Sequence, residues 1–350
     1  MDEPGPSQPI AIIDDPRFEA HEDPSGHHPE CPERLVAARD GLNKALGGLA
    51  CQRVQAREAN LVELSRVHAP AYLDKLGARL ARGQGQLDPD TYFNAGTREA
   101  AWLAAGGVID LATTLLNGTS RRGFALLRPP GHHAVPNSSM GFCLLNNVAL
   151  AASAALAAGL RRVAIVDWDV HHGNGTQDMF YEDPRLLFIS LHQYPFYPGT
   201  GAAREIGRGA GLGFTANIAL PAGSGPETYG TAFRELVLPL LTQHAPELVL
   251  VSAGFDAHAR DPLASMNLTS DTYAALASSL LDLVDRQGHG RIGFVLEGGY
   301  DLYALADSVY QVGRAIAGAR TSLPEGKLRT VERAAIDAAR SQLRAHWPLA

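Results

Sequence analysis

The chain has 350 residues, of which 45% are hydrophobic and 19% are charged. This apolar content can bury a sizeable core and is too high for an intrinsically disordered protein. The net charge of −7 argues against a general nucleic-acid binder or a membrane-surface protein, because both need an excess of basic residues.

Short apolar runs bounded by turn residues recur along the chain and predict β-strands. In chain order the expected strands cover residues 10–13, 51–55, 123–127, 162–166, 186–190, 214–220, 248–252 and 292–296. Alanine- and leucine-rich stretches predict helices over 33–46, 61–81, 97–116, 147–158, 229–244, 270–287 and 328–345. Fully apolar strands that alternate with helices are typical of a buried parallel sheet with helices on both faces. We therefore predict one α/β domain over residues 1–350, with about eight strands and a flexible start at residues 1–9.

The cysteine content and the first residues bear on the cell compartment. Cys31, Cys51 and Cys143 are too few for a disulfide framework and have no CxxC spacing, which favours a reducing compartment. The start, MDEPGPSQP, is acidic and proline-rich, unlike a signal peptide. The most apolar stretch, 148–160, is too short to span a bilayer. We expect a soluble, cytoplasmic protein.

The polar residues with the most chemistry come directly after the predicted strands. They are the segments 167–171, 254–256 and 297–300 and, after a short proline-containing loop, the pair His132-His133. Ligands of open parallel sheets bind beyond the carboxyl ends of the strands. We therefore expect these four segments to meet at one edge of the sheet.

Three alternating side chains, Asp167, Asp169 and His171, suggest a cation site. In an extended segment they share one side, and Asp256 can supply a further ligand from another strand. Two carboxylates and one neutral histidine would balance a divalent ion and leave one coordination position open, as catalytic sites do. On the alternating residues alone, a polar strand end with a hydrogen-bonded histidine is an equal alternative.

Two further features suggest catalytic groups. His132 and His133 need an orienting partner on the second ring nitrogen if one is to act as a general base, and Asp167 and Asn174 are candidates. Tyr300 follows two glycines, so its phenol could enter a cleft and donate a hydrogen bond to an oxyanion. Taken singly, two surface histidines would be the better interpretation of the pair, and a buried tyrosine would be an equal alternative for Tyr300.

Six segments in this order resemble the zinc-dependent histone deacetylase and acetylpolyamine amidohydrolase superfamily, whose fold is arginase-like. They are RPPGHHA (128–134), GFCLLNNVA (141–149), DWDVHHGNGTQ (167–177), SLHQYPFYPGTG (190–201), SAGFDAHARDPL (252–263) and LEGGY (296–300). Asn174 and Glu297 make the chain most similar to class II deacetylases and bacterial histone deacetylase-like amidohydrolases.

The resemblance implies a role for each matching residue. It implies one zinc ion on Asp169, His171 and Asp256, paired active-site histidines His132 and His133 backed by Asp167 and Asn174, and Tyr300 as the transition-state phenol. It also implies a potassium ion at the Asp167 side chain and at backbone groups of residues 169 and 171, Ser190 and Leu191, and a less secure second potassium near Phe180 and Asp183. The ligand set does not exclude iron in place of zinc.

The resemblance extends to the substrate channel. The Gly141 carbonyl would accept a substrate N–H, and Phe142 and Tyr197 would form the channel walls, with tyrosine where many relatives have phenylalanine. Asp90 is similar to a rim carboxylate that holds a peptide backbone, although a solvated loop carboxylate is the alternative. Leu263 is similar to lysine deacetylases, whereas some polyamine-selective relatives have glutamate at the mouth.

These features together predict a zinc-dependent hydrolase that removes acetyl or other acyl groups from the side-chain amine of lysine. Metal-activated water, a histidine base and a tyrosine that stabilises the oxyanion would do the chemistry. An acetylpolyamine amidohydrolase, or a hydrolase of another small N-acyl or ester compound, is the alternative. A non-catalytic acyl-lysine reader and an arginase-like ureohydrolase fit less well. The expected partners are acetyl-lysine proteins or small acetylated amines and a second copy of the chain, without nucleic acid or membrane.

Overall fold

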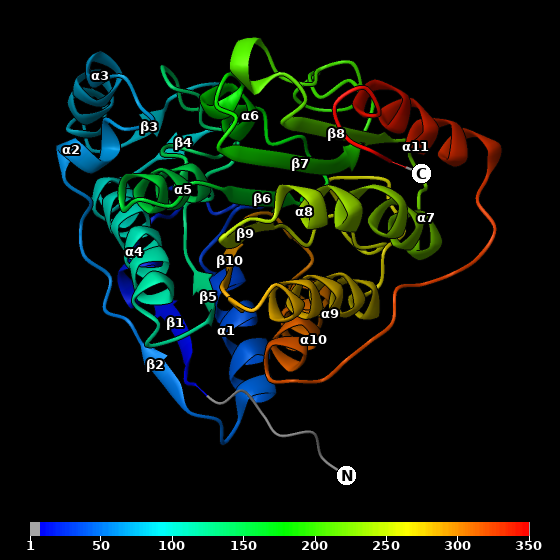
Figure 1. The fold of residues 1–350 in the computed structure, drawn as a ribbon. Helices are drawn as coiled ribbons and strands as arrows, with labels where there is room; N and C mark the ends of the chain where they lie inside the picture. The colour runs from blue at the N-terminus through cyan, green and yellow to red at the C-terminus, as the bar shows by residue number, and fades with distance from the viewer. Residues whose placement is uncertain (1–7, 350) are drawn as a thin grey trace.

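The computed structural model describes residues 8–349. Residues 1–7 of the predicted flexible start lie outside the described residues. Within 8–349, one large sheet lies between layers of helices, and a short two-stranded hairpin stands apart from it (Figure 1). This arrangement confirms the predicted α/β class.

Eight parallel strands form the sheet in the order β2-β1-β5-β10-β9-β6-β7-β8. Their bounds are β1 Ile10–Asp14, β2 Cys51–Arg53, β5 Arg122–Leu126, β6 Val163–Asp167, β7 Leu186–Gln193, β8 Thr215–Leu220, β9 Leu248–Ala253 and β10 Ile292–Leu296. All eight predicted strands are present. The six residues of β9 and all five of β6 are buried, as expected for strands covered on both faces.

Helices cover both faces of the sheet (Figure 1). One layer contains α4 (Thr97–Asn117), α5 (Asn147–Ala157) and α6 (Asn174–Phe180). The other contains α1 (Glu33–Leu46), α10 (Leu302–Ile316), α9 (Ser270–Arg286), α7 (Pro226–Ala232) and α8 (Leu238–His244), and α11 (Thr330–Leu343) packs beside β8. The apolar sides of these helices pack against the sheet, and the buried residues between the layers form the core.

Two predicted helices are interrupted in the structure, both near a proline. The segment 61–81 forms α2 (Leu61–Leu64) and α3 (Pro70–Leu80), because Pro70 lacks an N–H and favours the first position of a new helix. The segment 229–244 begins earlier, at Pro226, and contains a π-helical turn at Phe233–Val237 just before Pro239.

Several elements were not predicted. They are α6, α10 and the hairpin of β3 (Gly85–Gln86) and β4 (Tyr92–Phe93). The signal for α10 was present, since Asp301 caps the helix by accepting a hydrogen bond from the Ala304 amide. Strands of two residues are too short to produce a periodic pattern.

The sequence analysis considered only the stretch 148–160 as a possible membrane span and overlooked the longer helix α4. By length and composition, α4 is apolar enough to cross a membrane, and 78% of its most apolar window is buried inside the fold. The strands β1, β5 and β10 contact it. That burial is typical of a core helix.

Candidate active site

The four strands that precede the polar segments are neighbours in the centre of the sheet. Their order is β5-β10-β9-β6, and they run parallel. Their carboxyl ends therefore deliver the loops after Leu126, Leu296, Ala253 and Asp167 to one place. The sheet brings together the four segments that we expected to meet.

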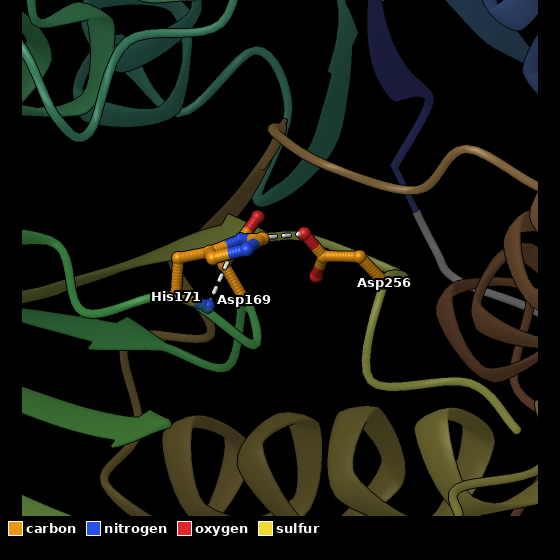
Figure 2. Close-up of side chains that lie close together, drawn as sticks. All are labelled: Asp169, His171 and Asp256. Atoms are coloured by element: carbon orange, nitrogen blue, oxygen red, sulfur yellow. Dashed lines mark hydrogen bonds and ion pairs between the residues drawn. The ribbon is translucent and has the colours of Figure 1, made fainter. Parts of the chain in front are cut away.

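Asp169, His171 and Asp256 form a compact cluster (Figure 2). Each offers one ligand atom, and these atoms lie within 4.8 Å of one another. His171 Nδ1 lies 3.1 Å from Asp256 Oδ2 and 3.3 Å from Asp169 Oδ1. Backbone amides hold both carboxylates in place, since Gly298 N donates to Asp169 Oδ2 at 2.8 Å and Val170 N donates to Asp256 Oδ1 at 2.9 Å.

The charges of this cluster suit a divalent cation. Burial and the neighbouring Asp169 raise the pKa of Asp256 to about 7. Burial alone would lower the pKa of His171, but its bonds to the two carboxylates raise it to about 10. A proton on His171 thus balances the buried carboxylates, and a metal ion can replace that proton. Two carboxylates and one imidazole are a ligand set that zinc accepts.

Asp167 does not belong to this cluster. Its carboxylate faces His132 and also accepts the Asp169 amide hydrogen at 3.1 Å. The prediction that Asp167, Asp169 and His171 share one side was wrong in this respect. The alternation assumed extended backbone, whereas β6 ends at Asp167 and the chain bends over residues 169–171.

The two adjacent histidines have different partners and different charges. His132 Nδ1 lies 3.0 Å from Asp167 Oδ2, and His133 Nδ1 lies 2.8 Å from Asn174 Oδ1. Burial lowers the pKa of His132, but the Asp169 and Asp167 carboxylates raise it well above 6.5. Burial and the charges of His132 and His171 lower the pKa of His133 well below 6.5. His132 is therefore cationic and His133 neutral.

The hydrogen bond to Asn174 also fixes the tautomer of His133. An amide oxygen only accepts hydrogen bonds, so His133 Nδ1 carries the proton. Its Nε2 is then an acceptor. The ring edge lies against the Tyr197 ring, with centroids 5.2 Å apart. A neutral histidine with a free nitrogen in a cavity can take up a proton.

Tyr300 is held from two sides. Its amide donates to Asp261 Oδ2 at 2.7 Å, and the Arg34 guanidinium carbon lies 4.8 Å from the centre of its ring. Burial raises the pKa of the Tyr300 phenol well above 10, although the Arg34 charge opposes this shift. The phenol therefore stays protonated and can donate a hydrogen bond.

Arg34 belongs to a buried ion cluster behind Tyr300 that the sequence analysis missed. Its side chain donates to the carbonyls of Gly299, at 2.6 Å, and Glu297. It also pairs with Glu30 at 2.9 Å, and Arg128 pairs with the same carboxylate at 2.5 Å. A buried glutamate between two arginines has no local signature, because its partners come from distant parts of the chain.

A cavity of about 180 Å³ opens over these groups. Its lining includes predicted channel residues and the catalytic candidates: Asp90, His132, His133, Gly141, Phe142, Tyr197, Leu263 and Tyr300. It also includes Phe196, which the sequence analysis missed and which stacks on His171 with centroids 5.5 Å apart. Phe142 packs edge-on against Tyr300, with ring centroids 5.8 Å apart. The slot is narrow, and aromatic rings and histidines surround it.

The loop that carries Gly141 and Phe142 has an unusual backbone. Both residues have positive φ angles, 56° and 69°, and the Phe142 amide donates to Thr91 Oγ1 at 3.0 Å. A side chain at position 141 would collide with the His133 ring, so glycine is required there. The loop therefore brings the Gly141 backbone directly beside the histidine.

The predicted potassium residues lie on the far side of Asp167. Ser190 is the neighbour of Asp167 across the β6–β7 ladder, and Leu191 follows it in β7; both are buried. The Asp183 carboxylate is already paired with Arg185 at 2.6 Å. The geometry thus places Ser190 next to the carboxylate and leaves Asp183 engaged elsewhere.

Several known proteins are similar to this chain. A model of the histone deacetylase domain matches residues 28–316. A probable deacetylase from Archaeoglobus fulgidus is 42% identical over 79% of this chain and 77% of its own, and a histone deacetylase-like amidohydrolase from Pseudomonas aeruginosa is 42% identical over 79% and 73%. The human polyamine deacetylase HDAC10 is 41% identical over 91% of this chain, which spans 50% of HDAC10. The crystal structure of the HDA15 HD domain matches with a TM-score of 0.91 and 38% identity over 97% of both chains.

Proposed function

The chain belongs to the histone deacetylase family and is a deacetylase of that family, and from this premise we propose that it removes acetyl or related acyl groups from the side-chain amine of lysine. The observation that supports this most is the narrow cavity, which has His133 and Tyr300 in its lining and the cluster of Asp169, His171 and Asp256 at its base. A slender acyl-lysine side chain fits such a slot.

We propose that one zinc ion binds Asp169, His171 and Asp256. Their ligand atoms converge within 4.8 Å and their buried charges require a cation. When bound, zinc would polarise the acyl carbonyl and lower the pKa of a water molecule. The potassium ion that we propose beside Asp167 and Ser190 would offset part of the negative charge that the buried carboxylates bring together there.

In this proposal His133 moves the proton. Its free Nε2 takes a proton from the attacking water as the bond from water oxygen to acyl carbon forms. When the carbon–nitrogen bond breaks, the same nitrogen gives the proton to the departing amine. The cationic His132, held by Asp167, stabilises the negative charge that develops on the acyl oxygen. Tyr300 donates a hydrogen bond to that oxygen.

We propose lysine rather than a polyamine because of the channel mouth. Leu263 lines the cavity where a carboxylate would attract a second amine of a polyamine. Asp90 would accept hydrogen bonds from peptide amides, and the Gly141 carbonyl would accept the N–H of the acylated amine. Acetylpolyamine hydrolysis is the second candidate. Asp90 favours it, since it is the one carboxylate among the residues that line the cavity, and one relative is a polyamine deacetylase.

The test is amine release by the zinc-loaded protein from an acetyl-lysine peptide and from N-acetylputrescine, measured side by side. We expect a clearly faster rate with the peptide. A faster rate with N-acetylputrescine would overturn the lysine assignment and support the second candidate. Turnover of neither would contradict both and direct the search to other acyl groups and esters.

A further inference from the structure

A second cavity lies beside the channel and is basic. It has a volume of about 390 Å³ and opens between α3 and the loop of residues 137–139. Three cationic side chains line it, those of Lys75, Arg79 and Arg82. No acidic residue is part of its lining. We call this cavity the basic groove. In a chain with a net charge of −7, such a local excess of positive charge is notable.

The three cations form no ion pair within the described fold, although Arg82 also lines another cavity with Glu22 and Asp23. Among residues 8–349, none of them lies within 4.0 Å of a carboxylate. Arg79 donates only to the backbone carbonyl of Gln86, at 3.0 Å. Lys75 and Arg79 are four residues apart on α3, a spacing at which like charges repel. This arrangement of like charges does not stabilise the fold. A bound anion would be stabilised by it.

Other groups of the basic groove can also contact an anion. Ser138 and Ser139 supply hydroxyl groups, and Tyr72 supplies an apolar ring at its base. Two acidic residues adjoin lining residues in sequence, Asp74 beside Lys75 and Asp88 beside Leu87, and neither is part of the lining. The Asp88 carboxylate accepts the Asp90 amide hydrogen at 3.0 Å.

Two short chain segments connect the lining of the basic groove to that of the channel. Ser139 lines the basic groove and Gly141 lines the channel, and two residues span at most about 7 Å between Cα atoms. Leu87 lines the basic groove and Asp90 lines the channel, and their Cα atoms lie at most about 11 Å apart. An extended peptide advances about 3.3 Å per residue. A side chain two to four positions from the acyl-lysine can therefore reach the basic groove.

We propose that the basic groove binds an acidic side chain of the substrate peptide, two to four residues from the acylated lysine. This inference rests on the proposed lysine deacetylase function and adds a sequence preference to it. Guanidinium and ammonium groups form charge-assisted hydrogen bonds with a carboxylate, and arginine does so with two parallel bonds. The volume of the basic groove, about 390 Å³, and the short chain segments that connect its lining to that of the channel fit one or two acidic residues of the bound substrate.

The test compares pairs of acetyl-lysine nonapeptides that carry aspartate or asparagine at one position, scanned over the four residues on each side. We expect kcat/KM to favour aspartate about three- to tenfold at one or two of these positions, through KM. Sodium chloride at about 0.5 M should reduce this ratio, because it screens exposed charges.

A triple variant, Lys75→Gln, Arg79→Gln and Arg82→Gln, should bring the ratio of the two peptides to about one. The matched control replaces three exposed cations elsewhere, Arg66, Arg286 and Lys327, with glutamine and changes the net charge equally. This control should keep the preference. An equal loss of preference in both variants, or a ratio of one in the unaltered protein, would overturn the proposal.

Binding of the same peptides, labelled and followed by fluorescence anisotropy, separates this proposal from the proposed function. If the peptides are not hydrolysed but the aspartate peptide binds more tightly and the triple variant abolishes the difference, the basic groove stands and lysine deacetylation fails. If both peptides are hydrolysed and bind equally, the basic groove fails and the deacetylase function stands. If neither peptide binds, both proposals fail.

Discussion

The base of the channel and its mouth differ in how their side chains are held. At the base, Asp169 and Asp256 are fully buried and fixed by backbone amides, and His133 is 4% exposed and tied to Asn174. At the mouth, Tyr197 is 37% exposed and Leu263 is half-buried. The base offers one geometry, as bond cleavage requires, whereas the mouth can change its residues at little cost in stability. Chemistry and selectivity are thus assigned to separate regions.

The largest expected effect comes from crowding the base. A methyl group in Gly298→Ala would occupy the place of the Asp256 and Asp169 carboxylate oxygens. We expect loss of bound zinc and a fall in activity of at least ~10³-fold, because metal polarisation is worth several kcal/mol. Zinc per chain and deacetylation rate check this. Gly77→Ala in α3, where a methyl group meets open space, is the control and should keep both values.

Removal of the proton-accepting nitrogen of His133 should have the next largest effect. His133→Ala should lower kcat by ~10²–10⁴-fold with zinc still bound, because general-base catalysis contributes about this much. Zinc content and single-turnover rates would be measured together. Near-normal turnover in the zinc-bound variant would show that another group takes the proton.

Tyr300→Phe should have a somewhat smaller effect. The phenylalanine ring keeps the contact with Phe142 and Arg34, so only the hydroxyl group is lost. We expect kcat to fall ~10²–10³-fold with little change in KM, as for loss of one oxyanion donor. A rise in KM with kcat unchanged would instead assign the hydroxyl to substrate binding.

At the mouth, one substitution should change selectivity rather than rate. Leu263→Glu places a carboxylate where a distant amine of a polyamine would lie. The ratio of kcat/KM for N-acetylputrescine to that for an acetyl-lysine peptide should rise about tenfold. Leu263→Gln, similar in size but uncharged, should leave the ratio nearly unchanged. Equal ratios in both variants would show that charge at this position does not select the substrate.

The smallest effect concerns the start of α5, where Asn146 caps the helix, and depends on pH. Buried His68 accepts a hydrogen bond from the Asn146 amide at 2.9 Å, and burial lowers the pKa of His68 from 6.5 to about 4. The unfolded chain therefore binds a proton that the folded chain excludes. The neutral His68 therefore costs the fold no stability above pH 6.5. As the pH falls from 6.5 towards 4, the free energy of unfolding decreases. His68→Gln should weaken the dependence of Tm on pH in this window, measured by thermal unfolding at several pH values. An unchanged dependence would contradict the assignment.

The base of the channel could be located from local patterns in the sequence, whereas the mouth residues came only from the family resemblance, and this difference has a physical reason. The residues at the base follow strands that are apolar on both faces, so strand ends mark their place along the chain. The segments that carry Asp169 and Asp256 could therefore be expected at one edge of the sheet from local patterns, whereas the set of three ligands was implied by the family resemblance. Only the side that Asp167 faces was wrong, because the extended geometry ends with β6.

The basic groove could not be predicted in this way. Lys75, Arg79 and Arg82 look like an ordinary solvated helix face, and only the fold places the loop of residues 137–139 opposite them. The ion cluster behind Tyr300 is similar, since Arg34 and Gly299 are 265 residues apart. Pairings of this kind depend on the order of strands in the sheet, which local patterns do not encode.

That cluster has a consequence for the synthesis of the protein. Arg34 leaves the ribosome early, whereas the carbonyls that it holds belong to the loop after β10, the last strand of the sheet. Domains are completed only when their distant contacts can close. A chain that ends before β10 has Asp169, His171 and Asp256 but lacks Tyr300 and the carbonyls that Arg34 holds. The contact between α1 and the loop after β10, and with it the setting of Tyr300, therefore forms only once β10 has been made.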